Sequence, residues 1–231
     1  MYKPNYEQDI FKNFADFKDL TITFIRHASL IFQFGDKYIY IDPVMEFCNY
    51  HQMPKADYIL ITHNHYDHFD QTAIDAIIKD NTIIIANEEV ANECSSGNLL
   101  ELNNNESVVL EGIDFAAVPA YNVSAGKMEY HPRALNNGYV INFGGKKVYV
   151  SGDTELIPDM KRLKNQIEIA FISVNQPYTM SVAQAIEAAK LINPKIFYPY
   201  HYGQTEFTTP INELKEGLTN SGIEVRIRKL D

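Results

Sequence analysis

The sequence has only two cysteines among its 231 residues, Cys48 and Cys94, and a long stretch of chain separates them. A disulfide scaffold, or a zinc site built from cysteines, needs more thiols at shorter spacings. Both designs are therefore excluded, and we expect the two thiols to be buried or half-buried in the fold.

Long apolar runs are also missing. No stretch approaches the roughly 18 apolar residues that a membrane-spanning helix needs. Residues 1–20 alternate charged with aromatic side chains and lack the apolar centre of a secretory signal. We therefore expect a cytoplasmic protein that has no membrane partner.

Basic residues are in the minority. The chain has 20 Lys and Arg against 30 Asp and Glu, which gives a formal net charge of -10. A protein with a general affinity for nucleic acid presents a basic face. We therefore expect no nucleic-acid partner, and the sequence leaves open whether the chain forms a homo-oligomer.

No linker rich in proline, serine or glycine divides the chain, and no segment has low complexity. A length of 231 residues and a hydrophobic fraction of 45% fit one globular domain with a substantial core, spanning residues 1–231. Within it, residues 1–19 are expected to be an arm or a short amphipathic helix, because Phe11, Phe14 and Phe17 recur at helical spacing.

Strands dominate the beginning of each half of the chain, and helices follow in both halves. This order predicts two sheets packed face to face with helices outside. Residues 120–137 have little periodicity, and long segments of this kind inside a compact domain are often functional. Strands are expected at residues 21–25, 30–34, 38–41, 58–61, 82–86, 98–102, 107–110, 113–119, 138–143, 147–150, 167–174, 195–199 and 224–227. Helices are expected at residues 71–79 (with Asp70 as N-cap), 88–93, 158–164, 181–191 and 210–218.

Histidine is scarce, with seven residues in all, yet three of them lie within residues 62–68, directly after the apolar strand at 58–61. Imidazole nitrogen and carboxylate oxygen are ligands of zinc and similar divalent ions. Side chains alternate along an extended segment, so His63 and His65 are expected to face one metal. Asp67 and His68 follow where the chain turns towards a helix and are expected to face a second metal. The alternative is a polar loop with several surface histidines.

This H-x-H-x-D-H pattern resembles the metallo-β-lactamase superfamily, and the resemblance extends from about Thr21 to Tyr202. It implies the α/β (α+β) class and a four-layer α/β/β/α sandwich. Segments 27–29, 131–132, 152–154, 178–180 and 199–203 are similar to those of the L-ascorbate-6-phosphate lactonase-like branch. Members of that branch usually carry glycines where this chain has residues 175–177.

The resemblance also implies further metal ligands. Asp153 stands in a Gly-Asp-Thr segment whose aspartate bridges two metals in the superfamily, and His201 stands where the superfamily has its final ligand. By themselves, a Gly-Asp turn and a histidine at a strand end are more often structural. In the implied arrangement the first metal has His63, His65 and Asp153, and the second has Asp67, His68, Asp153 and His201.

One position departs from the superfamily pattern. A third histidine for the first metal usually follows the strand that here ends near Tyr121, and Asn122 stands in its place. Neutral asparagine is a weak zinc ligand beside imidazole. His131 is the substitute that we expect, with a loop histidine exposed to solvent as the alternative. The sequence does not decide between Asn122 and His131.

Other residues receive roles from the same resemblance. His27 corresponds to a histidine that approaches the metals and is a candidate catalytic acid, and Asp42 corresponds to an aspartate that orients ligand imidazoles. Arg133 and Lys127 are candidates to hold an anionic group of the substrate, with solvent exposure as the alternative for both. Asn175 is a candidate to donate a hydrogen bond to the substrate.

The function that the resemblance implies is metal-dependent hydrolysis. Two divalent ions, zinc or alternatively manganese or iron, supply a metal-bound hydroxide that attacks a small anionic ester, lactone or phosphodiester. Asp67 ligates one metal and orients the nucleophile. The alternative is a metal-binding protein of the same fold without hydrolytic activity, a sensor or scaffold, and Asn122 favours it. Such a protein tolerates loss of Asp67 with metal retained at the other ligands.

Overall fold

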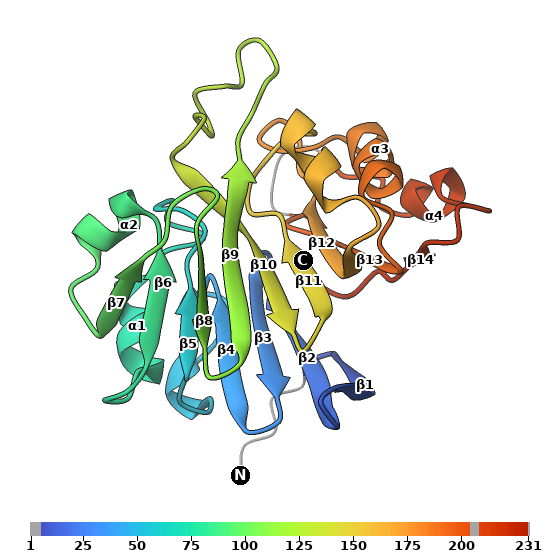
Figure 1. Cartoon of the computed structure of the whole chain (residues 1–231). Coiled ribbons are helices and arrows are strands. Elements are labelled where there is room, and N and C mark those ends of the chain that lie inside the picture. The colour runs from blue at the N-terminus through green and yellow to red at the C-terminus, as the bar shows by residue number, and fades with distance from the viewer. Residues whose placement is uncertain (1–5, 204–207, 231) are drawn as a thin grey trace. The chain divides into compact units, whose positions relative to one another are not determined.

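A computed structural model describes residues 6–203 and 208–230. The chain divides into two compact units, residues 1–103 and residues 104–231. Each unit holds one seven-stranded mixed sheet, and the two sheets have the same topology (Figure 1). In both, four antiparallel strands lead into three parallel ones, so the chain repeats a topology that its residues do not reveal as a repeat.

The first unit runs in spatial order from β1 to β7. Strands β1 to β4 are antiparallel, and β4 to β7 are parallel and joined through helical turns. Its strands are β1 (Gln8–Ala15), β2 (Lys18–Arg26), β3 (Ser29–Phe34), β4 (Lys37–Ile41), β5 (Tyr58–Leu60), β6 (Ile83–Ala86) and β7 (Asn98–Glu101). Its helices are η1 (Tyr50–Gln52), α1 (Gln71–Ile77) and α2 (Glu88–Glu93).

The second unit runs in spatial order from β14 to β8. Strands β8 to β11 are antiparallel, and β11 to β14 are parallel. Its strands are β8 (Ser107–Leu110), β9 (Ile113–Ala120), β10 (Asn136–Phe143), β11 (Lys146–Val150), β12 (Ile167–Ser173), β13 (Ile196–Tyr200) and β14 (Glu224–Val225). Its helices are η2 (Pro158–Leu163), α3 (Val182–Ile192) and α4 (Glu213–Gly217).

Each unit has a hydrophobic cluster between its sheet and its helices. In the first unit, Ile59 of β5 and Ile84 of β6 share a cluster with Ile74 and Ile77 of α1. In the second, the buried face of α3 joins residues of β12 and β13. The parallel strands β5 and β12 are almost continuously buried, as strands covered on both faces are. These packed strands give a rigid base to the loops that follow them.

The parallel strands of each sheet end at one edge, and the predicted site residues follow those ends. Strand β2 runs parallel to β4 because both are antiparallel to β3. In the first unit, segments after β2, β4 and β5 therefore meet at one edge. In the second unit, the same holds for segments after β9, β11, β12 and β13. We call these the carboxyl edges of the two sheets.

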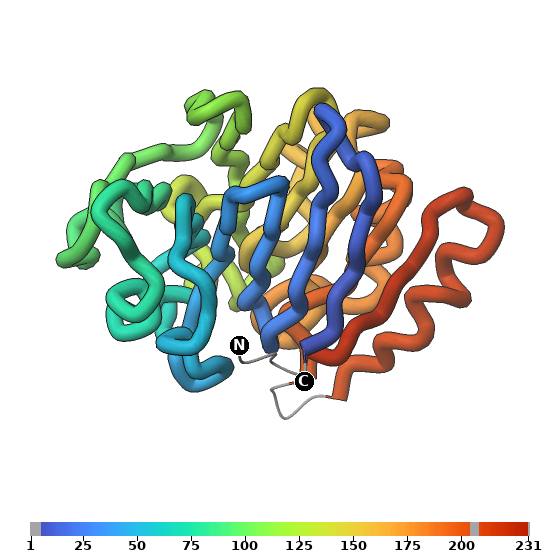
Figure 2. Tube along the Cα trace, turned by 90° about the horizontal axis from the view of Figure 1, so that it is seen from below, coloured from blue at the N-terminus to red at the C-terminus, as the bar shows by residue number. Residues whose placement is uncertain are grey.

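The helix expected within residues 1–19 is wrong for residues 8–15, which form strand β1. This strand pairs with β2 along the outside of the first sheet (Figure 2). Its register shifts between Phe11 and Ala15, and Asn13 takes a left-handed conformation with φ of 47°. The irregularity lets Phe11 and Phe14 meet edge to face, so that they share a face at a spacing of three without a helix. Phe17 is 98% exposed and does not pack on the body.

The other expected elements are present, with ends shifted by a few residues. Asp70 caps α1 as predicted, and its carboxylate accepts hydrogen bonds from the backbone N–H groups of Thr72 and Ala73. Residues 1–5, part of the expected N-terminal segment, lie outside the described residues. Among the helices that the structure describes, none is both long and apolar enough to cross a membrane.

Candidate metal centre

The first unit presents its site residues on three consecutive turns of its carboxyl edge. His27 follows β2, Asp42 follows β4, and the histidine-rich segment 62–68 follows β5. His27 and Asp42 take left-handed backbone conformations, with φ of 54° and 43°. Such conformations are uncommon for residues other than glycine and cluster at functional sites. The backbone is therefore bent sharply where these two side chains leave the sheet.

Asp42 is fully buried and organises the histidines around it. Its carboxylate accepts hydrogen bonds from the Thr62 backbone N–H (2.8 Å) and the Thr62 hydroxyl (2.7 Å), and it lies 2.8 Å from Nδ1 of His68. The Thr62 hydroxyl lies 3.0 Å from Nδ1 of His63. Burial raises the pKa of Asp42, while His68 and Thr62 act to lower it. With a proton on each Nδ1, both histidines keep Nε2 as a lone-pair donor, which is how carboxylates orient metal ligands.

The remaining motif side chains bring their donor atoms close together. Nε2 of His63 lies 3.0 Å from Nδ1 of His65, which confirms that these two side chains face the same way. Oδ2 of Asp67 lies 3.7 Å from Nε2 of His68 and 3.1 Å from Nε2 of His27. The motif residues are not yet in a helix, since α1 begins only at Gln71. We call His63, His65, Asp67 and His68 the first ligand set.

The second unit presents Asp153 and His201 at its own carboxyl edge. Asp153 follows β11 after Gly152, whose φ of 61° lies in the left-handed region that glycine adopts without strain. Gly138 on β10 allows a close approach, because a Cβ there would lie 2.7 Å from the carbonyl oxygen of Ser151. His201 follows β13, and its Nε2 lies 3.1 Å from Oδ2 of Asp153. Both side chains are almost fully buried.

His131 reaches the same aspartate from the long segment between β9 and β10. Its Nε2 lies 3.2 Å from Oδ2 of Asp153, and it is 2% exposed, so the solvent-exposed alternative is wrong. Asn122 lies beside it: the Asn122 N–H donates to the carbonyl of His131 at 2.9 Å. The Asn122 amide nitrogen donates to the carbonyls of Lys127 and Tyr178. We call His131, Asp153 and His201 the second ligand set.

The donor separations within each set fit a divalent metal. A tetrahedral zinc with bonds of about 2.0–2.1 Å holds its donors roughly 3.3 Å apart. The separations in the two sets are 3.0 and 3.7 Å in the first and 3.1 and 3.2 Å in the second. All the donors are imidazole nitrogens or carboxylate oxygens, which suit zinc, and carboxylates also suit manganese. The residues present therefore match metal ligands in chemistry and in spacing.

Three predicted substrate-binding residues lie in the second unit, and their roles stay predictions. Arg133 is exposed, with its guanidinium 5.1 Å from the centre of the Tyr121 ring. Lys127 is half-buried and donates to the side-chain oxygen of Gln176 at 2.7 Å, so it is not simply exposed. Asn175 is buried, with its amide nitrogen 3.5 Å from Nδ1 of His201.

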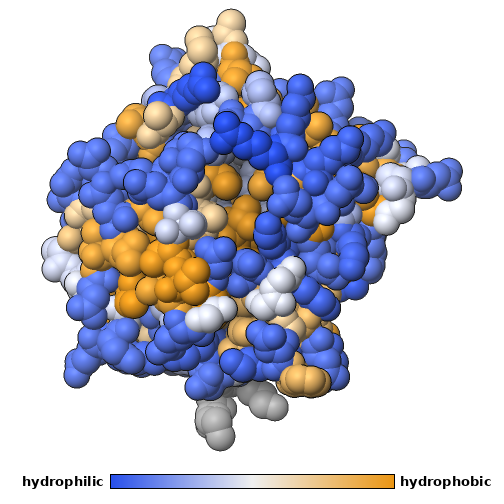
Figure 3. All heavy atoms as spheres, in the orientation of Figure 1, coloured by the Kyte–Doolittle hydropathy of each residue, from blue (hydrophilic) through white to orange (hydrophobic). Residues whose placement is uncertain are grey.

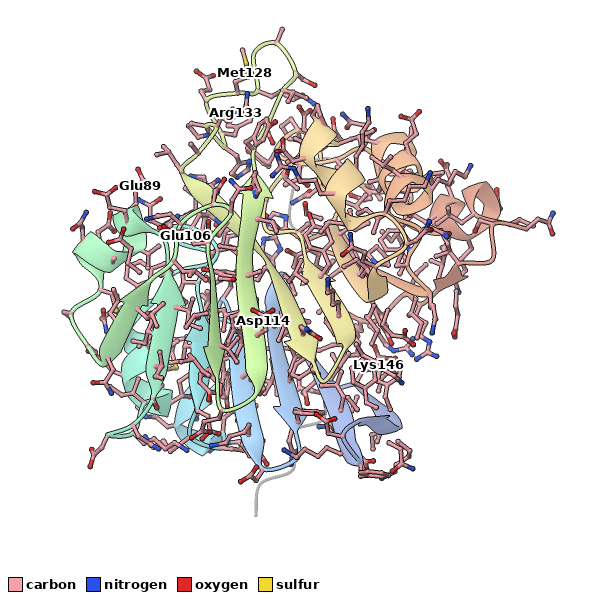
Figure 4. All side chains as sticks on the ribbon, in the orientation of Figure 1. Glu89, Glu106, Asp114, Met128, Arg133 and Lys146 are labelled. Atoms are coloured by element: carbon pink, nitrogen blue, oxygen red, sulfur yellow. The ribbon has the colours of Figure 1, made fainter. Side chains whose placement is uncertain are left out.

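The segment between β9 and β10, residues 121–135, extends beyond the ends of both strands (Figure 1). Arg133 and Met128 lie on it (Figure 4). Figure 3 shows hydrophobic side chains among the hydrophilic ones on this segment, at the top of the view. Val123 and Met128 are exposed there despite their apolar side chains. The segment thus has a mixed polar and apolar surface at the carboxyl edge of the second sheet.

Two site residues were missed by reasoning from the sequence. Thr62 begins the histidine-rich segment, and nothing in the sequence indicates that its hydroxyl links Asp42 to His63. Glu155 had no recognisable signal, but it is fully buried two residues after Asp153 and accepts two backbone hydrogen bonds from the segment 121–135. Only the pairing of distant segments reveals either role.

Comparison with known proteins gives consistent matches. A family model described as a beta-lactamase superfamily domain matches residues 21–201. A UPF0173 metal-dependent hydrolase from Nanoarchaeum equitans is 31% identical over 224 residues, covering 92% of this chain and 98% of the relative. A crystal structure described as a metal-dependent hydrolase from Parabacteroides distasonis is 49% identical, with a TM-score of 0.90, covering 98% of this chain and 100% of that one. Igni18, a metallo hydrolase from Ignicoccus hospitalis, is 23% identical with a TM-score of 0.77, covering 91% and 95%, and shows the fold alone. The metallo-β-lactamase type of fold predicted from the sequence is confirmed.

Proposed function

Since this chain belongs to the beta-lactamase superfamily, and within it to the UPF0173 metal-dependent hydrolases, we propose that it hydrolyses a small, anionic ester, lactone or phosphodiester with two divalent metal ions. The family supports hydrolysis and the need for metal. The substrate class, the number of metals and zinc as their identity are parts of the proposal.

One observation carries the proposal. Each unit places imidazole nitrogens and carboxylate oxygens about as far apart as the ligands of one metal ion are, and most of these groups are buried. Burying several ionisable groups is costly unless they are paired or bind a metal. We propose that the first and second ligand sets act together, with Asp153 shared between two metals, as the superfamily pattern implies.

Bound divalent ions would lower the pKa of a water molecule towards neutrality and take up negative charge on the scissile carbonyl or phosphoryl oxygen. The chain's own residues have separate tasks. Asp42 and Thr62 hold His68 and His63 with Nε2 available. His27, whose Nε2 lies 3.1 Å from Oδ2 of Asp67, would act as the catalytic acid. Arg133 would hold an anionic group of the substrate.

The test is hydrolysis that depends on metal. Purified protein is assayed with a nitrophenyl ester, a phosphorylated lactone and bis(nitrophenyl) phosphate, before and after chelation, and then after adding back zinc, manganese or ferrous ions. We expect one of these substrate types to be hydrolysed, activity to be lost on chelation, and one metal to restore it.

The matched variant is Asp67→Asn, which keeps the shape of the side chain but loses its charge. An enzyme loses activity in this variant even at saturating metal, because Asp67 would orient the nucleophile as well as ligate one metal. Protein that holds its metals, hydrolyses none of the three substrates and is unaffected by Asp67→Asn in metal binding would favour the non-catalytic alternative.

A further inference from the structure

We propose that Glu155 is a positioning residue: it fastens the segment 121–135 to the turn that carries Asp153, and so keeps His131 at Asp153. The inference rests on the proposed function in one respect, because it takes His131 to be a metal ligand. The fastening itself stands on hydrogen bonds within the second unit.

The turn that carries Asp153 is joined to the beginning of the segment by consecutive hydrogen bonds. The Thr154 hydroxyl donates to the Tyr121 carbonyl at 2.9 Å, and the Glu155 N–H donates to the same carbonyl at 3.1 Å. One carboxylate oxygen of Glu155, Oε2, then accepts from the N–H groups of Val123 at 2.8 Å and Ser124 at 2.7 Å. The first residues of the segment are thus held to residues 154–155.

A buried carboxylate is an unusual choice for this position. Glu155 is fully buried, and its other oxygen, Oε1, makes no hydrogen bond to the described part of the chain. Burial raises the pKa of Glu155, but hydrogen bonds from Ser124 and Val123 and the charge of Lys127 lower it overall. Two backbone N–H groups converge on Oε2, and hydrogen bonds from N–H groups to a carboxylate are of the stronger, charge-assisted kind.

The later part of the segment, at His131, is hydrogen-bonded back to its beginning, at Asn122. The Asn122 N–H donates to the His131 carbonyl at 2.9 Å, which brings residue 131 back beside residue 122. The Asn122 amide nitrogen donates to Lys127 within the segment and to Tyr178 outside it. A compact loop whose ends are joined in this way is an Ω-loop.

These bonds form a continuous path from Glu155 to His131. Glu155 holds residues 123 and 124, Asn122 lies directly before them, and its N–H fixes His131. His131 in turn lies 3.2 Å from Asp153, two residues before Glu155. Loss of the Glu155 charge should therefore loosen the loop at its origin and let His131 move away from Asp153.

The experiment compares Glu155→Gln with the matched control Glu129→Gln, which removes the same charge from an exposed position on the same segment. Backbone hydrogen exchange is measured on metal-free protein, and metal affinity by competition with a chelator. In Glu155→Gln we expect exchange at Val123 and Ser124 to be about tenfold faster, since neutral hydrogen bonds are weaker than charge-assisted ones. We expect affinity for the more weakly held metal to fall about 10- to 100-fold. Glu129→Gln should change neither quantity.

Glu155→Asp provides a second variant that keeps the charge and shortens the side chain by one methylene, and it should give intermediate exchange rates. Unchanged exchange at Val123 and Ser124 in Glu155→Gln would overturn the inference. Faster exchange with unchanged metal affinity would also overturn it, because the loop would then open without disturbing His131. Failure of the proposed function looks different: wild-type protein would bind no metal, and the exchange rates would still decide whether Glu155 holds the loop.

Discussion

Asp153→Asn is expected to weaken both metals at once and to reduce hydrolysis by roughly 10³-fold, which corresponds to about 4 kcal/mol of transition-state stabilisation. Oδ2 of Asp153 lies 3.2 Å from Nε2 of His131 and 3.1 Å from Nε2 of His201, so one oxygen lies close to both nitrogen donors. A neutral amide in its place is a much weaker ligand. Metal content after dialysis and the rate constant kcat at saturating metal measure the two effects.

The control for this variant is Asp114→Asn. Asp114, labelled in Figure 4, is the second residue of β9. At about 3.3 Å per residue it lies about 20 Å along the strand from the carboxyl edge. The variant Asp114→Asn removes the same charge from the same unit, and it should leave metal content and activity unchanged. Asp153→Asn protein that retained two metals through dialysis would contradict the shared role of Asp153.

Asp42→Asn is expected to fold but to bind the metal of His68 about 10- to 100-fold more weakly, as losses of outer ligand-orienting groups do. The Asn amide would present N–H groups to Nδ1 of His68, which now faces a carboxylate at 2.8 Å. The His68 proton would then move to Nε2, the atom that would bind the metal. Asparagine tolerates the left-handed backbone at this position, where φ is 43°, so the fold should be kept.

Asp57→Asn serves as the control for Asp42→Asn. Asp57 is also a buried aspartate of the first unit, but it accepts from the Tyr38 N–H and from Lys79 rather than from a histidine. The variant Asp57→Asn should lower the free energy of unfolding without changing metal affinity. Nitrogen-15 chemical shifts of His68 report its protonated nitrogen directly, and a signal with Nδ1 still protonated in Asp42→Asn would contradict the explanation.

The sequence predicts that His63 and His65 face the same way, because the pattern that places them is local. His63 and His65 lie two residues apart on an extended segment, so alternation alone places them on one side. The apolar run before them identifies the strand that delivers them to the edge of a sheet. A similar local signal, the N-cap at Asp70, predicts α1.

What the sequence could not supply depends on contacts between distant segments. Asn122 and His131 remained alternatives because only the bond that closes the loop places them side by side. The sequence gives no sign of the role of Glu155, because its partners are backbone N–H groups, which every residue except proline has. The N-terminal helix was wrong because strand pairing with β2 and a bulge near Asn13 reproduce helical spacing in an extended chain. In each case, pairing between distant segments determines the structure, and such pairing leaves no local pattern in the sequence.

If the two ligand sets hold two metal ions, those ions can be counted in the purified protein. Elemental analysis of purified wild-type protein and of His131→Ala is the measurement. We expect close to two metal ions per chain in the wild type and about one in His131→Ala, because Nε2 of His131 lies 3.2 Å from Oδ2 of Asp153, which we propose is shared by two metals. A wild type with no more than one metal, unchanged by His131→Ala, would contradict it.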